Sequence, residues 1–323
     1  MSAGYASRLS DYPRKGICGL PENVDTKRNL TTKLNQLVKL VREAKHLVIL
    51  TGAGISTSAG IPDFRGPKGI WTLEQKREKA AKREQRKKRK LNASNATTNG
   101  QDGEEKEKEG APKNDAVPSF DFSKANPTLT HKAITALAKR GILKFCITQN
   151  VDGLHRRSGL SRDKHAVLHG CAFTEQCSVC KTEHFRDFDT GGMSFKPTGR
   201  KCEVESCGGD LLDTLLDWED LLPEDDLERS ESHCEKSDLA LCLGTSLRIE
   251  PAGSLPTYAK RYVIVNLQQT PKDDGASLII RAPVDTVMKH LLEQLGVDSD
   301  EWQNENDDND EKPAIERLWK MPS

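Results

Sequence analysis

The sequence predicts an α/β fold in which a parallel sheet, covered by helices on both faces, is interrupted by a small cysteine-bearing module. Three observations support this prediction: short apolar runs that alternate with helical patterns, a glycine-rich turn directly after the first run, and two closely spaced pairs of cysteines. The 323 residues suffice for one large domain and a small one.

Apolar runs of strand length recur along the chain, at residues 47–50, 143–148, 239–243, 262–267 and 278–280. Helical patterns lie between some of them, at 131–139 and 284–295. Before the first strand, apolar side chains recur at helical spacing from Leu34 to Val41, and Thr31 or Thr32 is a candidate cap for this helix. Apolar strands that alternate with helices are typical of a parallel sheet buried on both faces.

The first strand is followed by a glycine turn with the spacing Gly52-x-Gly54-x5-Gly60. Glycines at such a turn let the backbone approach a pyrophosphate, and we expect a following helix to point its free N–H groups at that charge. The spacing differs from the usual dinucleotide-binding pattern of Gly-x-Gly-x2-Gly, so a generic turn without a ligand remains an alternative.

A rigid proline turn, an acid, an aromatic ring and an arginine follow at once. Arg65 can pair with phosphate, and Phe64 can cover a planar ring. Asp63 could equally be only a helix cap, and Phe64 only part of the core.

Cysteines occur as Cys177-x2-Cys180 and, after 21 residues, Cys202-x4-Cys207. Two close pairs in a reducing compartment predict a structural zinc site for one ion, with four thiolate ligands in a tetrahedron and no open position. Because a closed site cannot activate water, we assign it a folding role. Four ordinary reduced cysteines are the alternative. Together the patterns predict a Rossmann-like parallel sheet domain with a small zinc-binding domain inserted.

The formal net charge of +0 hides two segregated segments. Residues 74–90 hold ten Lys/Arg against three Asp/Glu, whereas 298–311 hold eight Asp/Glu and no Lys/Arg. Residues 75–118 contain almost no large apolar side chain and are predicted to be disordered, with a solvated helix over 74–90 as the alternative. The acidic tail is predicted to be disordered as well.

The basic run 86–90 has three interpretations: a nuclear localisation signal, a patch for DNA phosphates, or a solvated loop. The acidic tail could fold back on this run or contact histones. No stretch approaches the roughly 18 apolar residues of a membrane span, and the first eleven residues lack the apolar core of a secretory signal. We therefore expect a soluble, intracellular protein whose thiols stay reduced.

Five motifs, in order between residues 47 and 295, resemble the signature of the sirtuin family. They are the glycine turn with its continuation 60–65, and the segments 148–155, 168–170, 244–247 and 265–268. The flanking segments 12–21, 66–71 and 216–220 resemble the class IV nuclear sirtuins, most closely the sirtuin-six type. The resemblance implies an NAD-dependent protein-lysine deacylase, acting on acyl-lysine of histones or other chromatin proteins in the nucleus and releasing nicotinamide and O-acyl-ADP-ribose.

The resemblance also implies the roles of individual residues. His169 would be the general base that takes a proton from a ribose hydroxyl, a task that suits an imidazole of near-neutral pKa. Asn150 and Asp152 would act with it in the nicotinamide and ribose pocket, although capping and turn formation after a strand are their alternative roles. The implied cofactor contacts are Gly52, Ala53, Gly54, Thr57, Asp63, Phe64, Arg65, Trp71, Gln149, Asn150, Asp152, His169, Gly244, Thr245, Ser246, Asn266, Leu267, Gln268 and Val284. Residues 217–219 and the stretch after Ser246 would flank an extended substrate peptide.

Three features depart from the family pattern. Cys171 stands beside the expected base, where class IV relatives usually carry asparagine, and could either tune the base or be inert. The second cysteine pair is closer together than in the vertebrate sirtuin-six type. The basic insert falls where relatives have a shorter connection, so family roles do not carry over to it.

We divide the chain into an N-terminal extension (1–24), the sheet domain in three parts (25–73, 119–172 and 211–297), the charged insert (74–118), the zinc-binding module (173–210) and the acidic tail (298–323). Two other functions stay open. One is protein mono-ADP-ribosyl transfer, which starts from the same activated ribose carbon. The other is a non-catalytic chromatin-binding module that senses NAD or ADP-ribose. An ordinary dehydrogenase is disfavoured by the glycine spacing.

Overall fold

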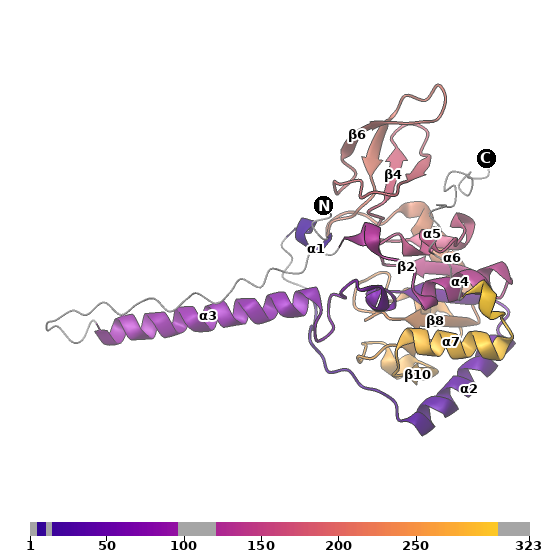
Figure 1. Cartoon of the computed structure of the whole chain (residues 1–323), viewed down its shortest axis with the longest axis horizontal. Coiled ribbons are helices and arrows are strands. Elements are labelled where there is room, and N and C mark those ends of the chain that lie inside the picture. The colour runs from indigo at the N-terminus through magenta and orange to yellow at the C-terminus, as the bar shows by residue number, and fades with distance from the viewer. Residues whose placement is uncertain (1–4, 11–14, 96–120, 303–323) are drawn as a thin grey trace.

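The computed structural model describes residues 5–10, 15–95 and 121–302 (Figure 1). Its centre is a six-stranded sheet of order β10-β9-β8-β1-β2-β3, and every pair of neighbouring strands is parallel. This confirms the predicted parallel sheet. The strands are β1 (Leu47–Thr51), β2 (Leu143–Thr148), β3 (His165–Val167), β8 (Leu239–Leu243), β9 (Tyr262–Val265) and β10 (Leu278–Ile280). The edge strand β3 was not predicted, since only two of its three residues are apolar.

Helices cover both faces of this sheet, as expected. The apolar side chains of α2 (Lys27–Glu43), α4 (Leu129–Lys139) and α7 (Val284–Leu295) pack on one face, and α6 (Glu224–Lys236) with the short helix η5 (Leu255–Tyr258) packs on the other. Alternate residues of β1 enter the two cores: Leu47 and Ile49 face the first, and Val48 and Leu50 face the second. Because side chains alternate across a strand, burial of both faces requires the continuous apolar run seen in the sequence.

The cap predicted for the first long helix is wrong. Helix α2 begins at Lys27, and the side chain of Thr26 caps it by accepting a hydrogen bond from the Asn29 N–H. The hydroxyls of Thr31 and Thr32 instead donate to main-chain oxygens one turn earlier, as threonines inside a helix do. The cap lies earlier because the helix extends beyond its apolar stripe.

The helix expected directly after the glycine turn is also absent. Two single turns of 3-10 helix take its place, η1 (Ala53–Ile55) and η2 (Thr57–Ala59). Gly60 follows with a positive φ of 85°, and Pro62 comes next but one. Glycine and proline so close together disfavour a continuous helix, so no helix dipole points into the turn.

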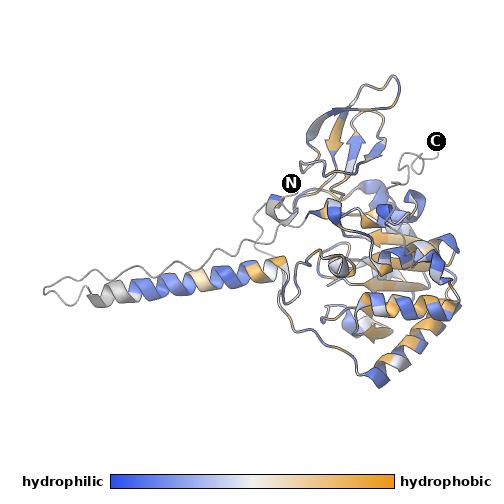
Figure 2. Ribbon diagram, in the orientation of Figure 1, coloured by the Kyte–Doolittle hydropathy of each residue, from blue (hydrophilic) through white to orange (hydrophobic). Residues whose placement is uncertain are grey.

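A long helix, α3 (Ile70–Asn95), extends away from the body of the molecule (Figure 1). Disorder over 75–95 is therefore a wrong prediction, and the alternative of a solvated helix describes this segment. The side chains from 76 to 89 are exposed, and Figure 2 shows the helix as mostly hydrophilic. Its Lys, Arg, Glu, Gln and Ala residues are good helix formers, and Lys88 lies 3.0 Å from Glu84 one turn before it. Residues 96–118 lie outside the described part of the chain.

The cysteine-bearing module is a four-stranded antiparallel sheet of order β5-β4-β7-β6, inserted between β3 and α6 and set to one side of the main sheet (Figure 1). Its strands are β4 (Thr174–Cys177), β5 (Glu183–Phe185), β6 (Pro197–Lys201) and β7 (Asp210–Asp213). The fully buried carboxylate of Glu175 accepts from Arg186 at 2.7 Å and from Arg200 at 2.6 Å. These ion pairs help to stabilise a module that has few apolar residues.

The remaining described helices are short: α1 (Tyr5–Arg8), α5 (Leu154–Arg157), η3 (Phe122–Lys124), η4 (Arg162–Lys164), η6 (Asp273–Gly275) and η7 (Ser299–Glu301). Among the described residues, no helix combines the length and apolarity that crossing a membrane requires. The acidic tail beyond 302 lies outside the described residues.

Candidate active site and metal centre

A cavity of about 660 Å³ opens at the carboxyl ends of the parallel strands. Ligands bind at this edge in open α/β sheets, and the volume is in the range of small-molecule sites. The loops after β1, β2, β8 and β9 all reach its wall. The predicted site residues that line it are Gly52, Ala53, Gly54, Asp63, Phe64, Arg65, Trp71, Gln149, Asn150, His169, Gly244, Thr245, Ser246, Asn266 and Gln268.

Four predicted contacts do not line this cavity. The exposed Thr57 donates its hydroxyl to the Gly54 main-chain oxygen at 3.1 Å. Leu267 accepts from the Asn23 N–H through its main chain, and Val284 packs in the core at the start of α7. Asp152 is buried behind the wall.

The close packing of Gly54 on Gly244 explains why the turn after β1 needs glycine. The Gly54 N–H donates to the Gly244 main-chain oxygen at 2.8 Å, and a Cβ built on Gly54 would lie 2.8 Å from the Gly244 Cα. No side chain fits between backbones this close. The two glycines thus join the ends of β1 and β8 into one floor of the cavity.

Aromatic rings and one buried cation form the next part of the wall. The rings of Phe64 and Trp71 lie 4.6 Å apart, and the guanidinium carbon of Arg65 lies 4.5 Å from the centre of the Trp71 ring. Arg65 also donates to the Lys15 main-chain oxygen at 2.9 Å. Burial lowers the pKa of Arg65 to about 10, so it stays charged at neutral pH and can attract an anionic ligand. The Asp63 carboxylate accepts from the Gly66 N–H at 2.9 Å, which closes a turn before α3 and is not the helix cap that the sequence left open.

His169 stands on the wall with one ring nitrogen fixed by backbone. Its Nδ1 atom lies 3.2 Å from the Gln149 main-chain oxygen, so Nδ1 carries the hydrogen and Nε2 the lone pair. Burial is the main cause that lowers the His169 pKa to about 4, and nearby Arg65 adds to it. The ring is therefore a neutral base at neutral pH.

Gly170 holds the chain behind this histidine. Its φ is +75°, and a Cβ there would overlap the main-chain oxygen of Thr214. Only glycine combines this backbone angle with so close a neighbour. The Leu-His-Gly motif therefore places His169 through a constraint on the residue after it.

A buried hydrogen-bonded set lies next to the histidine. The Asn150 Nδ2 group donates to the Gly52 main-chain oxygen at 3.1 Å and to the Ser56 hydroxyl at 3.3 Å. Ser56 in turn donates to Asp152 at 2.7 Å. Asp152 therefore fixes Asn150 through Ser56, a residue that we did not predict as part of the site although it stands in the glycine turn.

Cys171 turns away from the base. Its side chain packs in an apolar cluster, its sulfur accepts from the Phe173 N–H at 3.4 Å, and it is not part of the wall of the large cavity. Burial raises the pKa of its thiol. These contacts favour the inert alternative over a role in tuning His169.

One stretch of the cavity wall is apolar and was not predicted from the sequence. The Tyr5 hydroxyl donates to the Leu216 main-chain oxygen at 3.3 Å, which brings the N-terminal segment onto the cavity. Of the residues expected beside a substrate peptide, Asp217 and Trp218 line the wall, and Glu219 does not. The apolar stretch is formed by Tyr5, Leu9, Leu216, Trp218, Leu221, Leu222, Leu227, Ile249 and Pro251.

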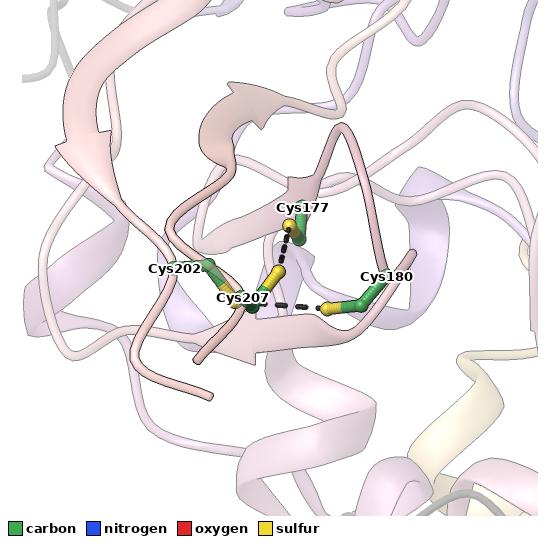
Figure 3. A group of neighbouring side chains, drawn as sticks. All are labelled: Cys177, Cys180, Cys202 and Cys207. Carbon is green, nitrogen blue, oxygen red and sulfur yellow. Dashed lines mark hydrogen bonds between the residues drawn. The ribbon is translucent and has the colours of Figure 1, made fainter. Parts of the chain in front are cut away.

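The four predicted zinc ligands converge on one point (Figure 3). The sulfurs of Cys177 and Cys207 lie 3.5 Å apart, and those of Cys180 and Cys202 lie 3.7 Å apart. A tetrahedron with Zn–S bonds of about 2.3 Å has sulfurs about 3.8 Å apart, whereas a disulfide needs about 2.05 Å. The four cysteines are therefore positioned to bind one structural metal ion.

A parallel α/β sheet with a cavity at its carboxyl edge, joined to a four-cysteine module, defines a nucleotide-binding protein with a structural metal site. The model of the Sir2 family matches residues 52–251 of this chain, which include the glycine turn, His169 and all four cysteines. The chain belongs to the Sir2 family.

Individual relatives agree with this assignment. The chain is 45% identical over 301 residues to the NAD-dependent protein deacetylase SRT1 of Arabidopsis thaliana, a match that covers 92% of this chain and 56% of the relative. It is 38% identical over 336 residues to the NAD-dependent protein deacetylase Sirt6 of Drosophila melanogaster, covering 100% of this chain and 93% of the relative. A solved structure of Sir2 with a p53 peptide and NAD+ shares its fold, with a TM-score of 0.54, 26% identity, and coverage of 82% of this chain and 100% of the other.

Proposed function

We propose that this protein is an NAD-dependent protein-lysine deacylase that releases nicotinamide and O-acyl-ADP-ribose. The observation that carries the proposal is the wall of one cavity, where the glycine turn, Asn150 and the neutral base His169 meet at the carboxyl edge of the sheet. The names of the relatives and the family membership support it. NAD, when bound, supplies a ribose carbon that an amide oxygen can attack as nicotinamide leaves.

His169 would act as the general base of this reaction. Its Nδ1–H is held by the Gln149 main chain, so Nε2 is the nitrogen with a lone pair to accept a proton. Burial that lowers its pKa keeps this lone pair free at neutral pH. A positioned base of this kind contributes roughly 10²–10⁴-fold to a rate.

Asn150 would bind the ribose or nicotinamide, and Asp152 would position the Asn150 side chain. Two acceptors, Gly52 and Ser56, already fix the Asn150 amide. A fixed amide loses little conformational entropy when a ligand binds, which is the basis of preorganised recognition. We propose the predicted wall residues as the cofactor contacts, with Arg65 and the glycine turn toward the phosphates and the Phe64 and Trp71 rings covering a planar group.

The acyl group of the substrate would enter along the apolar stretch of the wall. Leu9, Leu216, Leu227 and Ile249 offer apolar surface for a chain longer than acetyl. The acidic and aromatic side chains of Asp217 and Trp218 lie at the same wall, where we expect the substrate lysine to approach. We propose an acyl-lysine protein as the substrate, with histone tails as candidates.

We further propose that the protein acts in the nucleus on chromatin and that α3 contacts DNA. This rests on the exposed basic residues of α3, a mostly hydrophilic helix that extends away from the folded body (Figure 2). Contacts between such side chains and phosphates are independent of sequence and weaken as salt rises. The domain boundaries given for the sequence are part of the same proposal, with 173–210 as the unit that the metal ion stabilises.

Mass spectrometry of the reaction products tests the proposal. The purified protein is incubated with NAD and with acetylated or myristoylated histone peptides, and peptide and nucleotide products are analysed together. We expect a peptide lighter by the acyl mass and an equal amount of O-acyl-ADP-ribose. ADP-ribose attached to protein, with the peptide unchanged, would identify a mono-ADP-ribosyltransferase. Binding of NAD without any product would identify a sensing module.

A further inference from the structure

A second group of metal-binding side chains lies in the core, apart from the four-cysteine module. Cys146 lies on β2, His165 directly opposite it on β3, and His155 on the short helix α5. All three are buried, with at most 2% of any residue exposed. Their ligand atoms, the sulfur and one nitrogen of each ring, lie within 4.8 Å of one another.

The two imidazoles are incompletely satisfied. Within the described part of the chain, neither ring nitrogen of His165 has a hydrogen-bond partner, and Nδ1 of His155 has none. Nε2 of His155 is 2.9 Å from the Thr51 hydroxyl, so this ring is anchored at one end only. Buried polar atoms in folded proteins nearly always have a partner, so unpartnered nitrogens beside a thiol need an explanation.

We propose that Cys146, His155 and His165 bind one thiophilic d10 metal ion, copper(I) or zinc. A thiolate and two imidazoles suit these ions, whereas magnesium and calcium prefer oxygen. Donors around a trigonal centre with bonds of about 2.0–2.3 Å lie about 3.5–4 Å apart, so ligand atoms within 4.8 Å of one another need to draw together by at most about 1.3 Å. The ion binds as the Cys146 S–H gives its proton to solvent and the sulfur forms the metal bond.

The position of this group links it to the loop after β2, which carries Asn150 and Asp152. His155 and His165 line a small cavity together with Asn150, Asp152 and Cys171. Helix α5 begins two residues after Asp152, so an ion that ties His155 to the two strands would also fix the end of the loop that carries Asn150. We expect binding to raise the melting temperature and to leave the four-cysteine site as it is.

One buried water is the competing occupant, because the small cavity has a volume of about 10 Å³, close to the space of a single water. A water would satisfy ring nitrogens without needing a thiol. The two occupants differ in a way that can be measured: only a metal depends on Cys146, and only a metal gives an absorption edge.

Metal titration of the full chain, purified with its cysteine-module zinc, tests the proposal. Copper(I) is added without oxygen against a competing chelator, and zinc is added in a parallel arm, after which bound metal per chain is measured by elemental analysis. We expect one equivalent beyond the resident zinc in one of the arms. Cys146→Val and His165→Leu should lose this equivalent, and the matched control Cys242→Val, a buried cysteine on β8 outside the group, should keep it.

Several results would overturn the proposal. They are no added equivalent in either arm, an equivalent that Cys146→Val and His165→Leu retain, or copper uptake only at the cost of equal zinc release. If Cys146→Val fails to fold, crystals of the unaltered protein decide. An anomalous-scattering peak at the copper or zinc edge between the three side chains supports the site, and density without such a signal contradicts it.

Discussion

The Nδ1 atom of His169 lies 3.2 Å from the main-chain oxygen of Gln149, where β2 has just ended. The main-chain oxygen of Gln149 therefore sets the tautomer of the ring. The loop after β2 also carries Asn150 and Asp152. This one loop therefore orients the His169 ring through the Gln149 main chain and supplies the Asn150 amide. This arrangement supports assigning the proton transfer to Nε2.

The first prediction concerns pH. His169 accepts a proton only when neutral, and burial lowers its pKa to about 4, so the neutral form is lost only as pH falls through that value. We expect kcat/KM for deacylation, which reports the free enzyme, to stay level from neutral pH down to about 5 and to fall below that. An acid limb near the ordinary imidazole pKa of about 6.5 would contradict the burial argument.

Replacement of the base is the second prediction. His169→Ala should lower kcat by roughly 10²–10⁴-fold, because a positioned base is lost, while NAD affinity by calorimetry changes little. His290→Ala on α7, outside the cavity wall, is the matched control and should keep full activity. Unchanged turnover in the His169 variant would refute the proposed mechanism.

The third prediction concerns the fixed amide. Asn150→Asp removes the Nδ2 donor that the Gly52 oxygen and the Ser56 hydroxyl share, and places a carboxylate oxygen against a carbonyl. Two lost hydrogen bonds of about 0.5–1.5 kcal/mol each predict a loss in kcat/KM of about tenfold or more. Steady-state kinetics measure kcat/KM for this variant, and Asn29→Asp, at an exposed position on α2, is the control. Equal kinetics for the two variants would mean that Asn150 does not position the ligand.

The fourth prediction compares the loss of folding stability when alanine replaces each of two glycines that have similar backbone angles. Gly170 and Gly141 have φ of +75° and +71°, but only at Gly170 would a Cβ meet the backbone of Thr214. Gly141→Ala should lower the free energy of unfolding by about 1–2 kcal/mol, the cost of the left-handed angle alone. Gly170→Ala should cost clearly more, or yield no folded protein. Equal values in urea denaturation would show that the close contact is unimportant.

Metal removal is the fifth prediction. Cys180→Ser should lose one equivalent of zinc and loosen the small sheet, because the ion joins both cysteine pairs of a module with little apolar core. Protease sensitivity within 173–213 should rise, and activity should fall even though the site is closed. Cys18→Ser, outside the four-cysteine group, is the control. A variant that keeps its zinc would exclude Cys180 as a ligand.

Much of the fold follows from patterns that burial on both faces imposes. The run 47–50 is continuously apolar because its residues alternate between two cores, so it could be recognised as a strand. The cysteines could be recognised because a four-ligand site needs its donors in close pairs. The edge strand β3 and the small sheet were not recognised, since only two of the three residues of β3 are apolar and strands β5 and β6 consist mostly of polar residues.

Site residues that belong to a local sequence motif could be predicted, whereas site residues brought together from distant segments could not. His169 and Asn150 belong to motifs that can be read directly. Tyr5 reaches the cavity through contacts with distant residues, a hydrogen bond to a main-chain oxygen 211 residues away and an edge-on packing against Phe64, which no local pattern encodes. Most of the helix over 70–95 was predicted to be disordered because its side chains bury little apolar surface. Its helix-forming residues, and not packing against the body, account for the helix.

The most direct test of the central claim is a crystal structure with NAD and an acetyl-lysine peptide bound. We expect the dinucleotide along the glycine turn at the carboxyl edge of the sheet, with a ribose hydroxyl within hydrogen-bonding distance of His169 Nε2. A cavity that stays empty at saturating NAD, or a dinucleotide whose ribose lies away from that nitrogen, would contradict the account.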